Sequence, residues 1–135
     1  MKPINIKFKS NEDFFGDIKN AIKSNKSLLQ KSDTIYFDDY KGFQDFMFPT
    51  RFDVLAAIRA FKPTSIYFLA KLLQRHYQSV LKDCNALEVA GFILTEKKTG
   101  ERNQTVPSLA FDYDTIIVHN LEMGKMSHSL PSKAA

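Results

Sequence analysis

Residues 48–95 read FPTRFDVLAAIRAFKPTSIYFLAKLLQRHYQSVLKDCNALEVAGFILT, and this stretch decides the fold of the chain. Its apolar residues recur at helical spacing in three successive segments that turn signals separate. No acidic residue occurs between Asp53 and Asp83. The same interval contains five basic residues, namely Arg59, Lys62, Lys71, Arg75 and Lys82. Since a cluster of positive charge without negative charge is typical of proteins that contact phosphates, we expect these five basic side chains to converge on double-stranded DNA.

The first segment predicts a helix that starts near Pro49. Thr50 and Asp53 have the spacing of a capping box, in which two side chains satisfy the free N–H groups of the first turn. Lys62-Pro63 is expected to end the helix, because proline lacks the N–H that helix continuation needs. The residues expected to face the core are Phe52, Leu55, Ile58 and Phe61.

The second and third segments predict two helices joined by a tight turn at Gln74 and Arg75. Thr64 or Ser65 can cap the second helix. Gly91 can end the third helix in a left-handed conformation. The second helix is expected to bury Ile66, Leu69, Ala70 and Leu73. The third helix, over residues 76–90, is expected to bury Tyr77, Val80, Leu81, Cys84 and Leu87.

Two strands are predicted after the helices, at residues 92–95 and 105–111, with the polar loop 96–104 between them. Three helices followed by a hairpin with a basic tip predict a winged helix-turn-helix domain over residues 49–119. The tail, residues 120–135, is poor in large apolar residues and is expected to be flexible.

Residues 1–48 predict a small strand-helix-strand-helix arm. Alternating apolar residues indicate a strand at residues 4–8, and a second strand is expected at 34–37. Helices are expected at residues 12–23 and from Tyr40 to Met47. The fold class is therefore α+β, with a winged helix-turn-helix domain behind an accessory or dimerisation arm.

The order and spacing of two motifs resemble a known group of proteins. The segment LLQRHYQSVLKDCNALEVAGFI, residues 72–93, looks like the recognition-helix signature of predicted transcriptional regulators with MarR-like winged helices. The segment PSLAFDYDTIIV, residues 107–118, looks like their closing strand. The resemblance also implies an antitoxin role, because some members of that group are encoded beside toxin genes and act as their antitoxins, as in TumE/TumA-type pairs. This chain departs from the pattern at Gln74, where glycine is common, at His76, where an acid is common, and at Leu81, where a polar residue is common.

The outward face of the third helix carries the candidate base contacts. With the apolar stripe turned inward, the outward residues are Arg75, His76, Gln78, Ser79, Lys82 and Asn85. Gln78 suits adenine in the major groove, and Arg75 suits guanine or a phosphate. Ser79 and Lys82 are expected to hold the phosphate backbone. The alternative interpretation is an ordinary solvated helix face.

Two flanking regions complete the predicted DNA-binding set. Thr64, Ser65 and Tyr67 lie at a helix start, where free N–H groups attract a phosphate; simple helix capping is the alternative, and one residue can do both. Lys71 lies on the outward face of the same helix. In the hairpin loop, Lys98 and Arg102 are the expected contacts to a minor groove, with an ordinary surface loop as the alternative.

Composition excludes several other classes of protein. The net charge of +4 is only mildly basic, so the distribution of charge is more informative than its total. The single cysteine, Cys84, excludes an internal disulfide, and the Cys and His spacing matches no zinc site. Asp38-Asp39 favours helix capping over metal binding. No membrane span, secretory signal, cofactor motif or nucleophile-base pair is visible, so we expect a cytoplasmic protein that is not an enzyme and has no cofactor.

The sequence thus predicts a sequence-specific DNA-binding transcriptional regulator, a repressor that acts as a homodimer. Dimerisation is expected because one helix contacts only a few base pairs. The interface is assigned to the arm or to a closing strand at residues 115–118. The alternative is an antitoxin that binds a toxin protein and represses its own operon. Its toxin contacts would be Leu121, Met123, Met126 and Leu130 in the tail.

Overall fold

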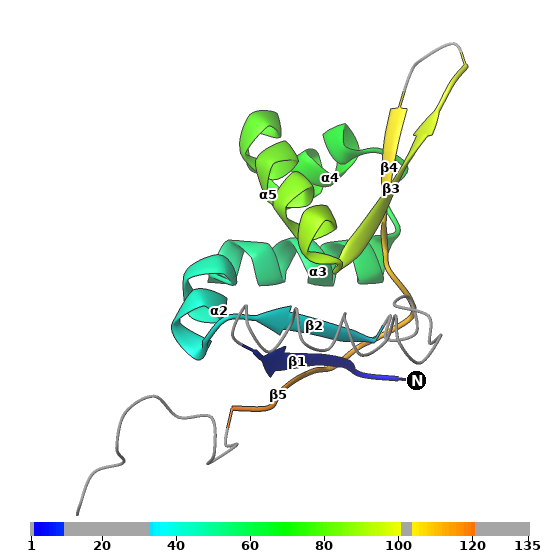
Figure 1. The fold of residues 1–135 in the computed structure, drawn as a ribbon. Helices are drawn as coiled ribbons and strands as arrows, with labels where there is room; N and C mark the ends of the chain where they lie inside the picture. Colours follow the sequence, from blue (N-terminus) through cyan, green and yellow to red (C-terminus); the bar gives the residue numbers. More distant parts are fainter. Residues whose placement is uncertain (1, 10–32, 101–103, 121–135) are drawn as a thin grey trace, which may run out of the picture.

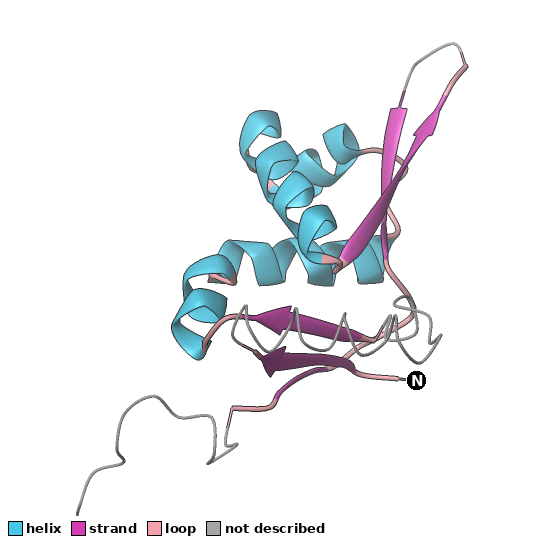
Figure 2. Cartoon of the chain, viewed as in Figure 1, coloured by secondary structure: helices cyan, strands magenta, loops and turns pink. Residues whose placement is uncertain are grey.

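The computed structural model describes residues 2–9, 33–100 and 104–120 of the chain. Within these residues the chain forms a mixed α/β structure of four helices and two small sheets (Figures 1 and 2). The elements in chain order are β1 (Ile4–Phe8), β2 (Thr34–Phe37), α2 (Tyr40–Phe46), α3 (Pro49–Phe61), α4 (Ile66–Leu73), α5 (Tyr77–Ala90), β3 (Ile93–Lys98), β4 (Gln104–Leu109) and β5 (Ile116–Val118).

A three-stranded parallel sheet in the order β2-β1-β5 lies below α3 in Figure 1. Ile4 and Ile6 of β1 are fully buried while Asn5 between them is only half-buried, so the predicted alternation and both arm strands are confirmed. The closing segment also forms a strand, β5, which pairs with β1 through the register Ile4↔Ile116. The last strand therefore hydrogen-bonds to the arm.

Helix α2 follows β2 directly and is capped by Asp39. Its Oδ1 accepts a hydrogen bond of 2.7 Å from the Gly42 N–H, which confirms the capping role expected for Asp38-Asp39. Phe43 of α2 is buried, and its ring lies 5.4 Å from that of Phe37. The helix predicted over residues 12–23 and the tail from residue 121 onward lie outside the described residues.

Helix α3 corrects two predictions. It begins at Pro49 with Phe48 as the N-cap and has no side-chain capping bond, so the predicted capping box at Thr50 is wrong. The buried face is also rotated from the predicted one. Phe52 and Phe61 are 40% and 63% exposed. The buried residues are Arg51, Val54, Leu55, Ala57 and Ile58. A buried cation on this face, which apolar periodicity does not reveal, accounts for the difference.

Helices α4 and α5 agree closely with the sequence. Ser65 caps α4, since its Oγ accepts a 3.0 Å hydrogen bond from the Phe68 N–H, and Ile66, Leu69 and Ala70 are buried. Gly91 ends α5 at a φ of 101°, in the left-handed region that glycine adopts without a steric penalty. Val80, Cys84 and Leu87 of α5 are buried as predicted.

Tyr77 and Leu81 depart from that agreement. Tyr77, which the sequence places in the core, is 38% exposed, and Leu81 is only half-buried. Asp83 is buried instead, at 4% exposure. The helix is thus turned so that a carboxylate, and not a tyrosine ring, faces the interior.

The antiparallel hairpin of β3 and β4 runs in register from Ile93↔Leu109 to Lys98↔Gln104. Both predicted strands are confirmed, and β3 extends three residues further than expected. Figure 1 shows the hairpin projecting past the helices. It also shows that the start of α5 and the far end of the hairpin lie at the same end of the molecule, away from the three-stranded sheet.

One core joins these elements. Ile4 and Ile6 of the sheet belong to the same buried cluster as Leu69 of α4 and Leu87 of α5. The Tyr113 hydroxyl, just before β5, donates a 2.7 Å hydrogen bond to the Phe92 carbonyl. The arm and the helices that follow it therefore pack as neighbours around a shared interior.

Gln74 is expected to carry a small conformational penalty. It lies between α4 and α5 at a φ of 54°, in the left-handed region. In this region the Cβ of a residue comes too close to a carbonyl oxygen, and this contact costs about 1 kcal/mol. Gln74→Gly should therefore raise the free energy of unfolding by up to about 1 kcal/mol in urea titrations. Gln74→Ala, which keeps the Cβ, is the control. Equal stability of the two variants would contradict the prediction.

The thiol of Cys84 is expected to make stability depend on pH. Burial raises its pKa from the ordinary 9.0 to about 12, and the neighbouring Asp83 carboxylate adds to the effect. The unfolded chain ionises first as pH rises, so the stabilisation is complete below pH 9 and is lost between pH 9 and 12.

Urea titrations at pH 8 and pH 10 should show a loss of about 1.4 kcal/mol that Cys84→Ala lacks. The control is the unfolding free energy of Cys84→Ala at pH 8, with which its value at pH 10 is compared. A pH dependence that is identical in both chains would refute the assignment.

Candidate nucleic-acid interface

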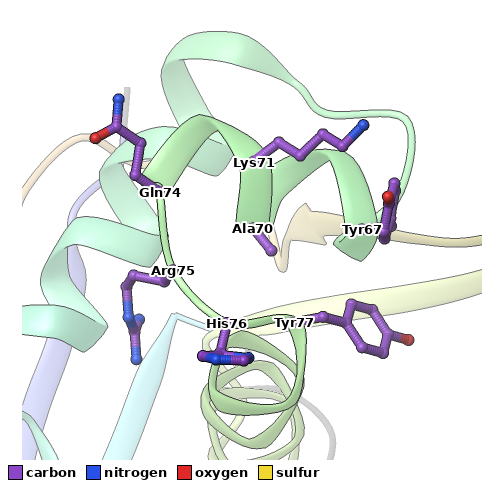
Figure 3. A pocket seen from close by; sticks show the side chains of 7 residues that line it. All are labelled: Tyr67, Ala70, Lys71, Gln74, Arg75, His76 and Tyr77. Atoms are coloured by element: carbon purple, nitrogen blue, oxygen red, sulfur yellow. The ribbon is translucent and has the colours of Figure 1, made fainter.

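The turn between α4 and α5 forms the candidate site. Gln74 is left-handed, and His76 is the N-cap of α5 without making a side-chain capping bond. The first turn of α5 contains no acidic residue. A pocket of about 450 Å³ opens here (Figure 3). It is lined by Tyr67, Ala70, Lys71, Gln74, Arg75, His76 and Tyr77.

Most of the predicted contacts lie on the surface around this turn. Five residues expected to face outward on α5 are exposed, and they are His76, Gln78, Ser79, Lys82 and Asn85. Lys71 of α4 is exposed as well, and so is Thr64 just before that helix. Ser65 differs, since it is only 8% exposed and its hydroxyl oxygen caps α4. The capping alternative for Ser65 is therefore the one that the geometry supports.

Arg75 does not face outward as predicted. Its guanidinium turns back against α5, where Nη2 lies 2.9 Å from Asp83 Oδ2 in an ion pair that lacks hydrogen-bond geometry. The side chain is 25% exposed. In Figure 3 it lies on the opposite side of the turn from Tyr67 and Tyr77. Arg75 is therefore placed to hold the turn and not to read a base.

Asp83 has a second cationic partner, Arg51 of α3. Arg51 Nε donates a hydrogen bond of 3.2 Å to Asp83 Oδ1, and Nη1 donates one of 2.9 Å to the Phe46 carbonyl. The guanidinium carbon lies 4.6 Å from the centroid of the Phe46 ring and 4.4 Å from that of Phe48. One carboxylate between two guanidiniums leaves the cluster with a net positive charge.

Sequence reasoning missed this cluster. The signal that could have revealed it is a charged residue at a core position, since Asp83 lies three residues after Val80 and one before Cys84. Charges are almost never fully buried without a partner. A buried acid therefore required a cation, and Arg51 and Arg75 were both available.

The five basic residues of the acid-free interval do not converge on one surface. Arg59 Nε donates a 3.1 Å hydrogen bond to the carbonyl of Tyr113, which lies in the segment that leads to β5. Arg59 and Lys62 line a different pocket, of about 470 Å³, beside β4. The expected convergence is wrong because α3 packs with its C-terminal turn against β4 and not toward α5.

The hairpin supplies further positive charge at the end where α5 begins. Lys97 and Lys98 of β3 are exposed and form the last pairs of the ladder, opposite Thr105 and Gln104. Arg102, the other predicted hairpin contact, lies in residues 101–103 and outside the described residues. The tail residues expected to contact a toxin are likewise outside them.

Two tyrosines lie at the turn, of which Tyr67 belongs to the helix start expected to attract a phosphate and Tyr77 to the expected core. Tyr67 and Tyr77 are 58% and 38% exposed, and their ring centroids lie 6.2 Å apart. Lys71 Nζ lies 4.7 Å from the centroid of the Tyr67 ring. The exposed surface around the turn therefore combines cations with aromatic area. We refer to Tyr67, Lys71, His76, Tyr77, Gln78, Ser79 and Lys82 together as the turn surface.

Comparison with known proteins places the chain in a family. Residues 46–118, more than half of the 135, match the HVO_A0114 family model, and the chain belongs to that family. No curated protein and no solved structure matches the chain. The matched residues contain α3, α4, α5 and the hairpin, and they end with β5.

The described residues contain neither a candidate metal site nor a candidate membrane span. In the parts of the chain that the structure describes, no three His, Cys, Asp or Glu side chains gather where they could hold a metal ion. Nor does any helix in those parts have the length and apolar character required to cross a membrane.

Removing the charge of Asp83 is expected to destabilise the fold severely. Asp83→Asn leaves two guanidiniums facing each other around a neutral amide, and losing one partner of a buried ion pair costs about 3 kcal/mol or more. Urea titration at pH 7 should show this loss of unfolding free energy.

Asp45→Asn is the matched control, because Asp45 pairs with Lys41 at 3.0 Å on an exposed surface. It should cost no more than about 0.5 kcal/mol. If both variants unfold at the same urea concentration, Asp83 is not the central partner that its geometry indicates.

Proposed function

We propose that this protein is a sequence-specific DNA-binding transcriptional regulator in which α3, α4, α5 and the hairpin act as a winged helix-turn-helix. Helices α4 and α5 form the helix-turn-helix pair, and β3 with β4 forms the wing. The resemblance of residues 72–93 and 107–118 to MarR-like regulators supports the same assignment.

The observation that carries the proposal is the absence of exposed negative charge from the turn surface. Between Asp53 and Glu88 the sequence contains one acid, Asp83. That acid is buried and faces two guanidiniums. The exposed side chains on α4 and the first half of α5 are consequently cationic or neutral, and a phosphate meets no like charge there.

The arrangement suits a duplex in a particular orientation. The start of α5 would enter the major groove, where Gln78 can pair with adenine and Ser79 can bond to either a base or a phosphate. Lys82 of α5 and Lys71 of α4 would hold the flanking phosphates. Lys98 of the hairpin would follow an adjacent minor groove, since it projects from the same end of the molecule.

A homodimer fits this function best. One recognition helix contacts only a few base pairs, whereas two copies bound one helical turn apart combine their discrimination. We assign the protein the role of a repressor, because a dimer seated on an operator blocks access to the promoter. The antitoxin alternative shares this DNA-binding surface and adds a toxin partner.

Salt dependence of binding tests the proposal. The full chain should bind duplexes selected from a random pool, and the logarithm of its affinity should fall linearly with the logarithm of salt concentration. Lys82→Ala and Lys71→Ala should each weaken binding and lower that slope by about 0.9 for each phosphate that the variant no longer neutralises. Fluorescence anisotropy at several salt concentrations measures both quantities.

Lys41→Ala is the matched control, because Lys41 is an exposed lysine on α2, outside the turn surface. It should leave affinity and slope unchanged. Selection that enriches no duplex, or equal slopes for all three variants and the parent, would rule out the proposed interface.

A further inference from the structure

The turn surface contains more aromatic area than phosphate binding requires. Phosphates are held by cations and N–H groups, which Lys71 and Lys82 already supply. Tyr77 and Tyr67 nevertheless leave 38% and 58% of their surface in water. An exposed aromatic side chain among cations indicates a partner that presents an apolar group next to a negative charge.

The position of Tyr77 determines what that contact can be. It is the first residue of α5, and residues at the start of a recognition helix meet the edges of bases in the major groove. The one apolar group on a base edge in that groove is the 5-methyl of thymine. Cytosine carries only a hydrogen atom at the same ring carbon, and adenine and guanine have no methyl group in the groove.

We propose that the ring of Tyr77 contacts the 5-methyl group of a thymine and thereby determines the sequence preference of this protein. The inference rests on the proposed DNA-binding function and extends it to a particular base. Gln78, the next residue, would then read the neighbouring base pair by hydrogen bonding.

Charge favours DNA over a protein as the occupant of this aromatic surface. Lys71 Nζ lies 4.7 Å from the Tyr67 ring, and His76 adjoins Tyr77 in the same pocket. In this fully described stretch, from residue 54 to residue 87, the one carboxylate is the buried Asp83. An apolar protein partner would have to cover the Lys71 ammonium without a counter-charge, whereas a phosphate beside the thymine supplies one.

Tyr67 acts as a positioning residue for Tyr77. The two ring centroids lie 6.2 Å apart with an interplanar angle of 53°, which is within the range of favourable aromatic pairs. Tyr67 lies on α4, the helix that crosses the backbone and does not enter the groove. Its ring therefore lies beside both the Tyr77 ring and the Lys71 ammonium.

Replacing thymine by uracil in the selected operator tests the contact on the unaltered protein. Uracil pairs as thymine does and lacks only the methyl group. At the contacted thymine of one half-site, the substitution should weaken binding about four-fold, as expected for one buried methyl-sized group. Substitution at thymines elsewhere in the site should leave the affinity unchanged.

Variants then assign the effect to Tyr77. Tyr77→Ala should bind the thymine and uracil operators equally, while Tyr77→Phe should keep the four-fold ratio because the ring remains. Tyr67→Ala should lower the ratio, and Tyr67→Phe should restore it. Phe61→Ala, which removes a 63% exposed ring at the end of α3, is the control and should leave the ratio unchanged. Thermal melting confirms that each variant is folded.

The outcomes separate this inference from the proposed function. If the chain binds selected DNA but tolerates uracil at every position, Tyr77 does not read thymine and the DNA-binding function stands. A four-fold ratio that survives in Tyr77→Ala assigns the methyl contact to another residue and also overturns the inference. If no duplex is bound at all, the proposed function itself fails.

Discussion

The pairing of the Asp83 carboxylate with Arg51 and Arg75 is the interaction on which the rest of the structure depends. Asp83 comes from the middle of α5, Arg51 from the first turn of α3 and Arg75 from the turn that precedes α5. A buried carboxylate without partners would cost several kcal/mol, so the three elements must meet in one geometry. The cluster therefore sets the rotation of both α3 and α5 about their axes.

The same cluster links the arm to α5. Arg51 lies against the rings of Phe46 and Phe48 and donates to the Phe46 carbonyl. Phe46 also stacks on Phe92, at a centroid distance of 6.2 Å, where α5 passes into the hairpin. Through Arg51 and Phe92, α2 is thus linked to the middle of α5 and to the end where α5 passes into the hairpin. The parallel sheet adds a second link, because β5, the last strand of the matched family region, pairs with β1 of the arm.

Burying Asp83 also decides the electrostatics of the surface. A carboxylate on the outer face of α5 would repel phosphates, whereas one held between two guanidiniums contributes no exposed negative charge. The consequence is that Arg75 is used internally. The cations that remain on the turn surface are lysines, which bind phosphate without the paired geometry that lets arginine recognise guanine. Under the proposed function, base recognition then falls to Gln78 and to the exposed tyrosine ring at the start of the helix.

The sequence by itself determined the features that depend on neighbours along the chain. The alternation of Ile4 and Ile6 with polar residues predicted β1, the apolar spacing of Ile66, Leu69 and Ala70 predicted the buried face of α4, and Gly91 marked the end of α5. The caps at Asp39 and Ser65 are local hydrogen bonds and were equally visible. Only the tertiary structure decided that Arg75 turns inward, that Tyr77 remains exposed and that Arg59 bonds to the Tyr113 carbonyl. Two of these depend on partners that helical periodicity does not reveal. Arg75 pairs with Asp83, which also bonds to Arg51 of α3, and Arg59 bonds to the carbonyl of Tyr113. Periodicity reports which face of a helix is apolar, but it does not report which charge on that face finds a counter-charge, and here that pairing fixed the orientation of the helices.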